Sequence, residues 1–235
     1  MEGPPREEAS NNAEELLRQL KSILPSGEEE MIHLKAETLR SLVKLRSPIP
    51  AMSQISLCRA DLCALDLTYV DFTESDLSHA LLIGSNLSQA DLVRTRFHQA
   101  NLGGANLYNA DMTEADFTQA NLAKTDLSEA ILVSAKLMGA DIGHGSDLTY
   151  ADLTGADLTG ANLRAAKVPG VTFTGAKLDG ADLRLVENLT CDQLRSAHFD
   201  ASTRLPRYIK VHWKSDTDYD IWEDHSEDEE EASAS

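Results

Sequence analysis

The most regular feature of the chain is a five-residue repeat of hydrophobic and polar positions. From Leu57 to Leu183 a large hydrophobic residue, most often Leu, recurs every five residues, with one extra residue between Ile142 and Leu148. The residue two places before it is mostly Ala, and the residue between the two is mostly Asp or Asn. Twenty-six such units follow one another. The pattern predicts a small inward residue, a polar outward residue and a large inward residue in every unit.

A period of five fits neither a straight α-helix nor a flat strand. At 100° per residue the large residues would circle a helix, and in a strand alternate ones would point to opposite faces. All of them stay inside only if the chain turns a corner in every unit. The outward corner positions hold residues that suit turns, as in Thr154-Gly155 and Thr159-Gly160. We therefore expect short extended segments joined by tight turns and stacked as a solenoid.

Over about residues 55 to 185 this repeat resembles the pentapeptide-repeat family. The resemblance implies a mainly β fold, a right-handed quadrilateral parallel β-helix with four units in each coil. The central Leu or Phe and the preceding Ala would point inward. At ~4.8 Å between paired strands, such a rod would be roughly 31 Å long. Phe97 and Phe117 fall in adjacent coils and should stack, and the Phe residues expected in the core are Phe72, Phe97, Phe117 and Phe173.

The chain divides into four parts: an N-terminal helical segment (1–50), the β-helix (51–185), a C-terminal cap (186–214) and an acidic tail (215–235). Two amphipathic helices are predicted in the first part, over 13–24 and 28–46, separated by Pro25-Ser26-Gly27. They would form either a lid on the first coil or a hairpin for dimerisation or partner docking. The sequence does not separate these two interpretations.

The segment after the last repeat is similar to the short "LTxxQL…LP" sequence that often closes these solenoids. It begins at Leu189 and Thr190 and continues to Leu205 and Pro206. Thr190 is predicted to cap a short helix whose Leu194 reaches back over the last coil. Residues 208–213 form a candidate edge strand.

Charge is spread unevenly along the chain. The net charge is −18, and residues 215–235 carry ten acids and no Lys or Arg. This composition predicts a disordered, solvated tail. No stretch clusters Lys and Arg, so we do not expect direct binding to nucleic acid. No stretch is apolar enough to span a membrane and the first residues do not resemble a signal peptide, so we expect a cytoplasmic protein.

The sequence offers no strong candidate for a catalytic or metal site. Ser, His and Asp stand together in residues 143–147, where the repeat slips by one residue. A one-residue bulge at a corner is favoured there over a ligand role for His144. The cysteines Cys58, Cys63 and Cys191 are too few and too loosely spaced for a disulfide framework or a zinc site. We expect no cofactor, no metal and no enzymatic activity.

Stacking the units every twenty residues arranges the outward residues in columns. One column, which we call the ladder, alternates in sign as a structural ion-pair array would: Asp76, Arg96, Asp116, Lys136, Asp157 and Lys177. Another contains Asp71, Asp91, Asp111, Ile131, Asp152 and Thr172. Its carboxylates either accept backbone N–H groups at the corners or form an acidic face for a basic partner. We name its four carboxylates the acidic stripe and take them as the candidate partner-binding residues: Asp71, Asp91, Asp111 and Asp152.

Two functions follow from the resemblance. The family is widespread in bacteria, above all in cyanobacteria, and what is known of it points to binding rather than catalysis. We therefore expect a non-enzymatic scaffold that binds another protein, with a homodimer through the N-terminal helices or a solenoid end as a further interpretation. The alternative is a DNA-mimicking binder of DNA gyrase or another type II topoisomerase. This rod lacks the long loops of many such members, and some of its acids are neutralised by Arg96, Lys136, Lys167 and Lys177.

Overall fold

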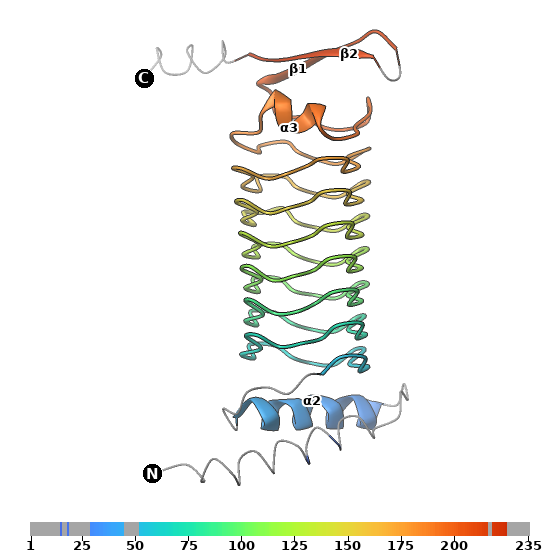
Figure 1. Cartoon of the computed structure of the whole chain (residues 1–235), viewed down its shortest axis with the longest axis vertical. Coiled ribbons are helices and arrows are strands. Elements are labelled where there is room, and N and C mark those ends of the chain that lie inside the picture. The colour runs from blue at the N-terminus through green and yellow to red at the C-terminus, as the bar shows by residue number, and fades with distance from the viewer. Residues whose placement is uncertain (1–14, 16–17, 19–28, 45–51, 216–217, 225–235) are drawn as a thin grey trace, which may run out of the picture.

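The computed structural model of the chain is a straight rod with a helix across one end and a small sheet across the other (Figure 1). It describes residues 15, 18, 29–44, 52–215 and 218–224. In chain order the elements are helix α2 (Glu29–Lys44), the stacked coils, helix α3 (Cys191–Arg195) and strands β1 (Ile209–Trp213) and β2 (Tyr219–Glu223). The helix expected over 13–24 lies outside the described residues except at two positions.

The coils stack through parallel bridges between residues twenty positions apart. Ser56 pairs with Asp76, and the three outward positions that follow pair in the same way with the next coil. Four outward residues thus fall in each coil, so the coil has four sides. Asp126 pairs with Asp147, a spacing of 21, because the coil between them contains the extra residue. The predicted β-helix and its register are confirmed, including the bulge.

Each side of a coil ends in a tight turn. At the first complete turn the Ala60 N–H donates to the Leu57 carbonyl at 3.0 Å, and Arg59 between them has a φ of 61°. A positive φ at the third residue is what a type II turn requires. The Arg59 N–H donates to the Ser78 carbonyl of the next coil at 2.9 Å. These bonds between coils help to hold many residues other than glycine in a left-handed conformation that they otherwise disfavour.

The core is one continuous column of inward residues. Every large central residue from Leu57 to Leu183 is at most 1% exposed, the four predicted Phe residues among them. The Phe97 and Phe117 rings stack as predicted, with centroids 4.7 Å apart and planes at 3°. Met52 is also fully buried, so one more unit precedes the first one recognised in the sequence. The rod is therefore filled by its own side chains.

Helix α2 lies across the N-terminal end of the rod (Figure 1). Its Ala36, Leu39 and Leu42 are buried in the same hydrophobic cluster as the coils. The Arg40 guanidinium reaches the first complete coil, where it donates to the Asp61 carbonyl at 3.0 Å and pairs with the Asp61 carboxylate at 3.1 Å. For residues 29–44 this packing supports the lid interpretation.

Helix α3 begins as the sequence predicted. The Thr190 hydroxyl accepts the Gln193 N–H, and the Gln193 side chain accepts the Thr190 N–H, which together form a capping box. Leu194 is fully buried. The Gln193 side-chain amide also donates to the Val171 carbonyl of the coil below at 2.9 Å. The helix thus satisfies backbone groups that the end of the solenoid would otherwise leave unpaired.

The prediction of a disordered tail over 215–235 is wrong for residues 219–223. These form β2, which pairs antiparallel with β1 from Ile209 opposite Glu223 to Trp213 opposite Tyr219. Ile221 is only 7% exposed, and the Tyr219 ring lies 4.8 Å from the Phe199 ring. Tyr219 and Ile221 alternate along the strand and give it a buried face, although the segment as a whole is acidic. Residues 225–235 lie outside the described part of the chain.

Removing β2 is expected to loosen the C-terminal end. The Cys191 N–H donates to the Glu223 carboxylate at 3.0 Å, and the Arg195 guanidinium donates to the Ile221 carbonyl at 3.0 Å. A chain that ends at Lys214 loses both contacts and the buried Ile221. We expect amide exchange in α3 to rise by about tenfold or more, measured by hydrogen–deuterium exchange. A chain that ends at Asp224 is the control, and equal protection of α3 in the two chains would contradict the packing described here.

Candidate partner-binding face

The structure brings the four residues of the acidic stripe into one column. Asp71 pairs with Asp91, Asp91 with Asp111, and Asp111 with Ile131, which in turn pairs with Asp152. Ile131 is 38% exposed and interrupts the line of carboxylates with an apolar side chain. Three successive carboxylates, an apolar residue and a fourth carboxylate therefore follow one another along one side of the rod at ~4.8 Å per step.

Each carboxylate of the stripe is held by its own turn. The Asp71 Oδ1 atom accepts the Thr73 N–H at 2.9 Å, and Asp111 accepts the Thr113 N–H at 3.0 Å and the Thr113 hydroxyl at 2.7 Å. The same backbone bond recurs at the other two stripe residues. The first interpretation, that corner N–H groups stabilise these carboxylates, is confirmed. These bonds fix the side chains and leave their negative charge in place.

The ladder differs from the acidic stripe because it compensates its own charge. The Arg96 guanidinium lies 3.9 Å from the Asp76 carboxylate, and the Lys177 ammonium lies 3.5 Å from the Asp157 carboxylate. Within the part of the chain that the structure describes, no Lys, Arg or His lies within 4.0 Å of a stripe carboxylate. The stripe is therefore the uncompensated column of the two.

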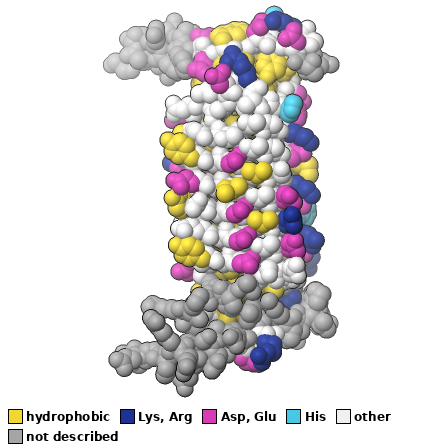
Figure 2. All heavy atoms as spheres, in the orientation of Figure 1, with side chains coloured by type: hydrophobic (Ala, Val, Ile, Leu, Met, Phe, Trp, Pro, Cys, Tyr) yellow, Lys and Arg dark blue, Asp and Glu magenta, His cyan; other side chains and the backbone are white. Residues whose placement is uncertain are grey.

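The corners that flank the stripe carry further side chains that sequence reasoning missed. The turns just before Asp71 and Asp152 present Tyr69 and Tyr150, which are 68% and 69% exposed. Figure 2 shows acidic and hydrophobic side chains gathered in lines along the rod. The signal was available in the sequence, because Tyr69 and Tyr150 stand four coils and one extra residue apart, at equivalent positions. Tyrosine rings beside carboxylates suit the recognition of Lys and Arg side chains.

A glycine gives the Tyr150 ring its place on the next coil. A Cβ atom built on Gly170 would lie 2.4 Å from the Tyr150 Cδ1 atom, and Gly170 itself has a φ of +67°. Any side chain here would have to displace the ring. One edge of the Tyr150 ring therefore lies against Gly170 in the coil that follows.

The remaining candidate chemistry in residues 143–147 is structural. Ser146 is fully buried, and its hydroxyl donates to the Leu122 carbonyl at 2.8 Å and the Gly143 carbonyl at 2.9 Å. His144 occupies the exposed turn, with its imidazole 4.0 Å from the Asp141 carboxylate. The serine points into the core and the histidine out of it, so the two do not form a nucleophile and base pair.

The described residues contain no cluster of metal ligands, no disulfide and no helix that could cross a membrane. They contain no group of three or more His, Cys, Asp or Glu side chains placed to hold a metal ion. Their cysteines, Cys58, Cys63 and Cys191, are free thiols, the last of them buried. None of their helices has the length and apolar character that a bilayer crossing needs.

The pentapeptide-repeat model matches residues 51–82, 71–109, 105–143 and 146–184, as eight copies of the repeat. Together these stretches cover more than half of the chain, so the chain belongs to the pentapeptide-repeat family. The fold of the family is a right-handed β-helix solenoid, which agrees with the coils described above. No protein of curated function matches the chain.

Several solved structures of pentapeptide repeat proteins are similar to the chain. HetL, which is involved in heterocyst differentiation regulation in the cyanobacterium Nostoc sp. strain PCC 7120, is 30% identical over 66% of this chain and 70% of HetL, with a TM-score of 0.43. A protein of the Arabidopsis thaliana thylakoid lumen is 36% identical over 47% and 68%, with a TM-score of 0.20. QnrB1, a plasmid-mediated fluoroquinolone resistance protein, is 19% identical over 67% and 91%, with a TM-score of 0.27.

Hydrogen bonds and ion pairs also set the acidity of some outward carboxylates. Burial opposes the ionisation of Asp157, but hydrogen bonds from the Thr159 hydroxyl and amide, together with the Lys177 ammonium, outweigh it and lower its pKa. The pKa of Asp147 is lowered in the same way by Thr149 and Lys167, again against burial. These carboxylates stay charged in the folded chain at a lower pH than in the unfolded one.

This lowering predicts a loss of stability in acid. A carboxyl whose folded pKa lies below its unfolded value of about 3.9 stabilises the fold above about pH 4, and the contribution is lost as the pH falls through the folded pKa. In the variant Asp147→Asn/Asp157→Asn the amide oxygen can still accept the turn N–H, but the charge is gone. Its melting temperature should be below that of the parent at pH 7, and the difference should shrink at pH 3. A difference independent of pH would contradict the assignment.

Proposed function

We propose that the chain is a non-enzymatic binding protein whose rod presents the acidic stripe to a basic partner protein. The observation that carries this proposal is the contrast between the two columns. The ladder meets its own charge with Arg96 and Lys177, whereas Asp71, Asp91 and Asp111 have no counter-ion among the described side chains. Membership of a family of repeat scaffolds supports a binding role over a catalytic one.

The site is organised before a partner arrives. Each stripe carboxylate already accepts a turn N–H, as Asp71 does from Thr73 at 2.9 Å, so little side-chain freedom is lost on binding. The rod itself is held by backbone bonds between all its coils. A partner with Lys or Arg side chains in a line fits this face, since the ammonium or guanidinium groups can meet the carboxylates and lie against the exposed rings of Tyr69 and Tyr150.

The alternative implied by the family resemblance is that the rod imitates DNA and binds DNA gyrase or another type II topoisomerase. DNA presents negative charge along both of its strands. Here bases alternate with the acids of the ladder, where Arg96 pairs with Asp76 and Lys177 with Asp157. Arg94 also lies between Glu74 at 3.2 Å and Glu114 at 2.9 Å, at the corner after the stripe. The negative charge is therefore concentrated on part of the surface. This favours a partner protein with a local basic patch over an enzyme that binds DNA along the whole duplex.

The test removes three charges from the stripe and, as a matched control, three from the ladder. The stripe variant is Asp71→Asn/Asp91→Asn/Asp111→Asn, and the ladder variant is Asp76→Asn/Asp116→Asn/Asp157→Asn. Asn can still accept the turn N–H, so both variants should fold, which circular dichroism would verify. All chains end at Asp224, so that the acidic residues beyond it cannot attract a basic partner on their own.

Each chain would first be used to capture proteins from the source organism, and association rates with a captured partner would then be measured at low and high salt. We expect the stripe variant to associate about three- to tenfold more slowly at low salt, with the difference vanishing at high salt. The ladder variant should keep most of the parent rate. Equal rates for all three chains, or a larger loss in the ladder variant, would overturn the proposal.

A further inference from the structure

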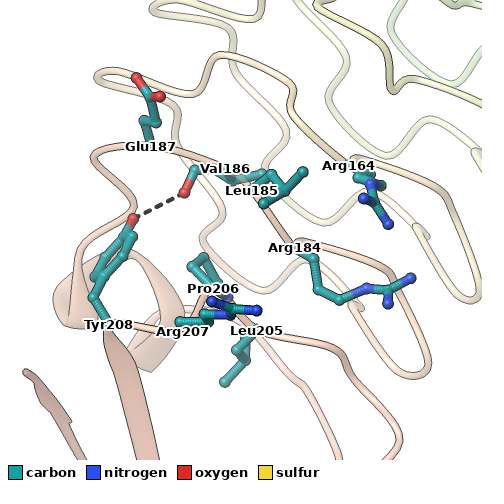
Figure 3. A pocket seen from close by; sticks show the side chains of 9 residues that line it. All are labelled: Arg164, Arg184, Leu185, Val186, Glu187, Leu205, Pro206, Arg207 and Tyr208. Carbon is teal, nitrogen blue, oxygen red and sulfur yellow. Dashed lines mark hydrogen bonds between the residues drawn. The ribbon is translucent and has the colours of Figure 1, made fainter. Parts of the chain in front are cut away.

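A pocket of about 400 Å³ opens at the C-terminal end of the rod, where the last coils meet the segment that leads into β1 (Figure 3). Three arginines line it, Arg164, Arg184 and Arg207, together with the apolar Leu205 and Pro206. The chain has a net charge of −18, so a pocket lined by three guanidinium groups differs in sign from the average charge of the molecule. Glu187 is the one acidic residue in its lining.

The three arginines come together from separate parts of the chain. Arg164 and Arg184 follow Asn162 and Asp182, which pair with each other on neighbouring coils, and Arg207 comes from the closing segment. Figure 3 shows all three side chains bordering the same space. The Arg184 Nε atom donates to Asp182 at 2.8 Å.

Two of these guanidinium groups have no acidic partner. Among the residues that the structure describes, no carboxylate lies within 4.0 Å of the Arg164 or Arg207 guanidinium. Both side chains belong to exposed residues. Guanidinium groups of this kind bind carboxylates through paired, charge-assisted hydrogen bonds, and the apolar side of the pocket leaves room for the stems of Glu side chains.

The described part of the chain ends at Asp224, beside this pocket. The Asp224 N–H donates to the Tyr208 carbonyl at 2.7 Å, and Tyr208 lines the pocket, with its hydroxyl bonded to the Val186 carbonyl at 3.2 Å (Figure 3). Five consecutive acids, Glu227 to Glu231, begin three residues beyond Asp224. Three extended residues span about 10 Å, which is enough to bring these acids from the rim into the pocket.

We propose that the arginine pocket binds the acidic segment Glu227–Glu231 of the same chain. Because the connection is so short, the effective concentration of the segment near the pocket is in the millimolar range. Several ion pairs, each of them weak, can then form together. The segment carries five negative charges, and the pocket offers Arg164 and Arg207, which pair with no carboxylate among the described residues. This contact lies at the end of the rod and does not involve the acidic stripe.

The test uses the full chain and a glutamyl endopeptidase, with cleavage within Glu227–Glu231 followed by mass spectrometry. The pocket variant is Arg164→Gln/Arg207→Gln, which spares the Arg184 pair with Asp182. The control variant is Arg59→Gln/Lys124→Gln, which removes two positive charges from exposed corners of earlier coils. Because both variants change the net charge equally, a difference between them reports the pocket rather than the overall field of the protein.

We expect the segment to be cleaved at least about threefold faster in the pocket variant than in the parent at low salt, and the control variant to match the parent. At 1 M salt, where the Debye length is about 3 Å, all three rates should converge. Backbone ¹⁵N relaxation of the full chain gives a second readout, with residues 227–231 more ordered in the parent than in the pocket variant.

Equal cleavage rates and equal relaxation in parent and pocket variant would overturn the proposal. Protection that rises with protein concentration would also overturn it, because the occupant would then be the segment of a second copy. Protection that is independent of concentration and lost only in the pocket variant would support it.

Discussion

The structure depends on the hydrogen bonds that hold each coil at a fixed distance from the next. The Leu57 N–H donates to the Asp76 carbonyl at 2.7 Å, and the Asp76 N–H returns to the Ile55 carbonyl at 2.8 Å, a pattern that recurs up the rod. With the spacing fixed, each side of a coil has room inside for one large and one small side chain. This explains why Leu or Phe and Ala recur every five residues.

The requirements of the turns also explain why the surface is acidic. In many units the outward Asp or Asn accepts the N–H group two residues later, as Asp76 does from Ser78 at 3.0 Å, so acids accumulate whatever the protein binds. Lys167 fits the same logic, because Pro169 has no N–H to satisfy. The positions of Lys and Arg among these acids therefore say more about binding than the number of acids does. Bases occur among the acids on the ladder side, at Lys167, at Arg94 and at the arginine pocket, and none occurs in the described column that carries the acidic stripe.

Much of the fold follows from the sequence because its contacts are periodic. The five-residue spacing was enough to place Phe97 against Phe117 and to locate the extra residue near His144. Strand β2 was missed because its few alternating apolar residues lie in an acidic segment, and because its packing depends on a contact between Tyr219 and the distant Phe199. The pocket was missed for the same reason, since the path of the closing segment, which no repeat predicts, brings Arg207 to the same pocket as Arg164. Periodic contacts are thus readable from sequence, and contacts between dissimilar segments are not.

The register of the coils is the claim on which the columns, the stripe and the pocket all depend, and cross-linking tests it directly. In a chain whose native cysteines are replaced by Ser, Ile131→Cys/Asp152→Cys joins positions 21 residues apart that the structure pairs across the bulge. Adjacent parallel positions fall within the Cα range of a disulfide, about 4.4–6.8 Å. We predict rapid intramolecular cross-linking under mild oxidation, and none in the control Ile131→Cys/Asp147→Cys, whose second cysteine lies on another side of the coil. Cross-linking of the control instead, or of both pairs equally, would contradict the register.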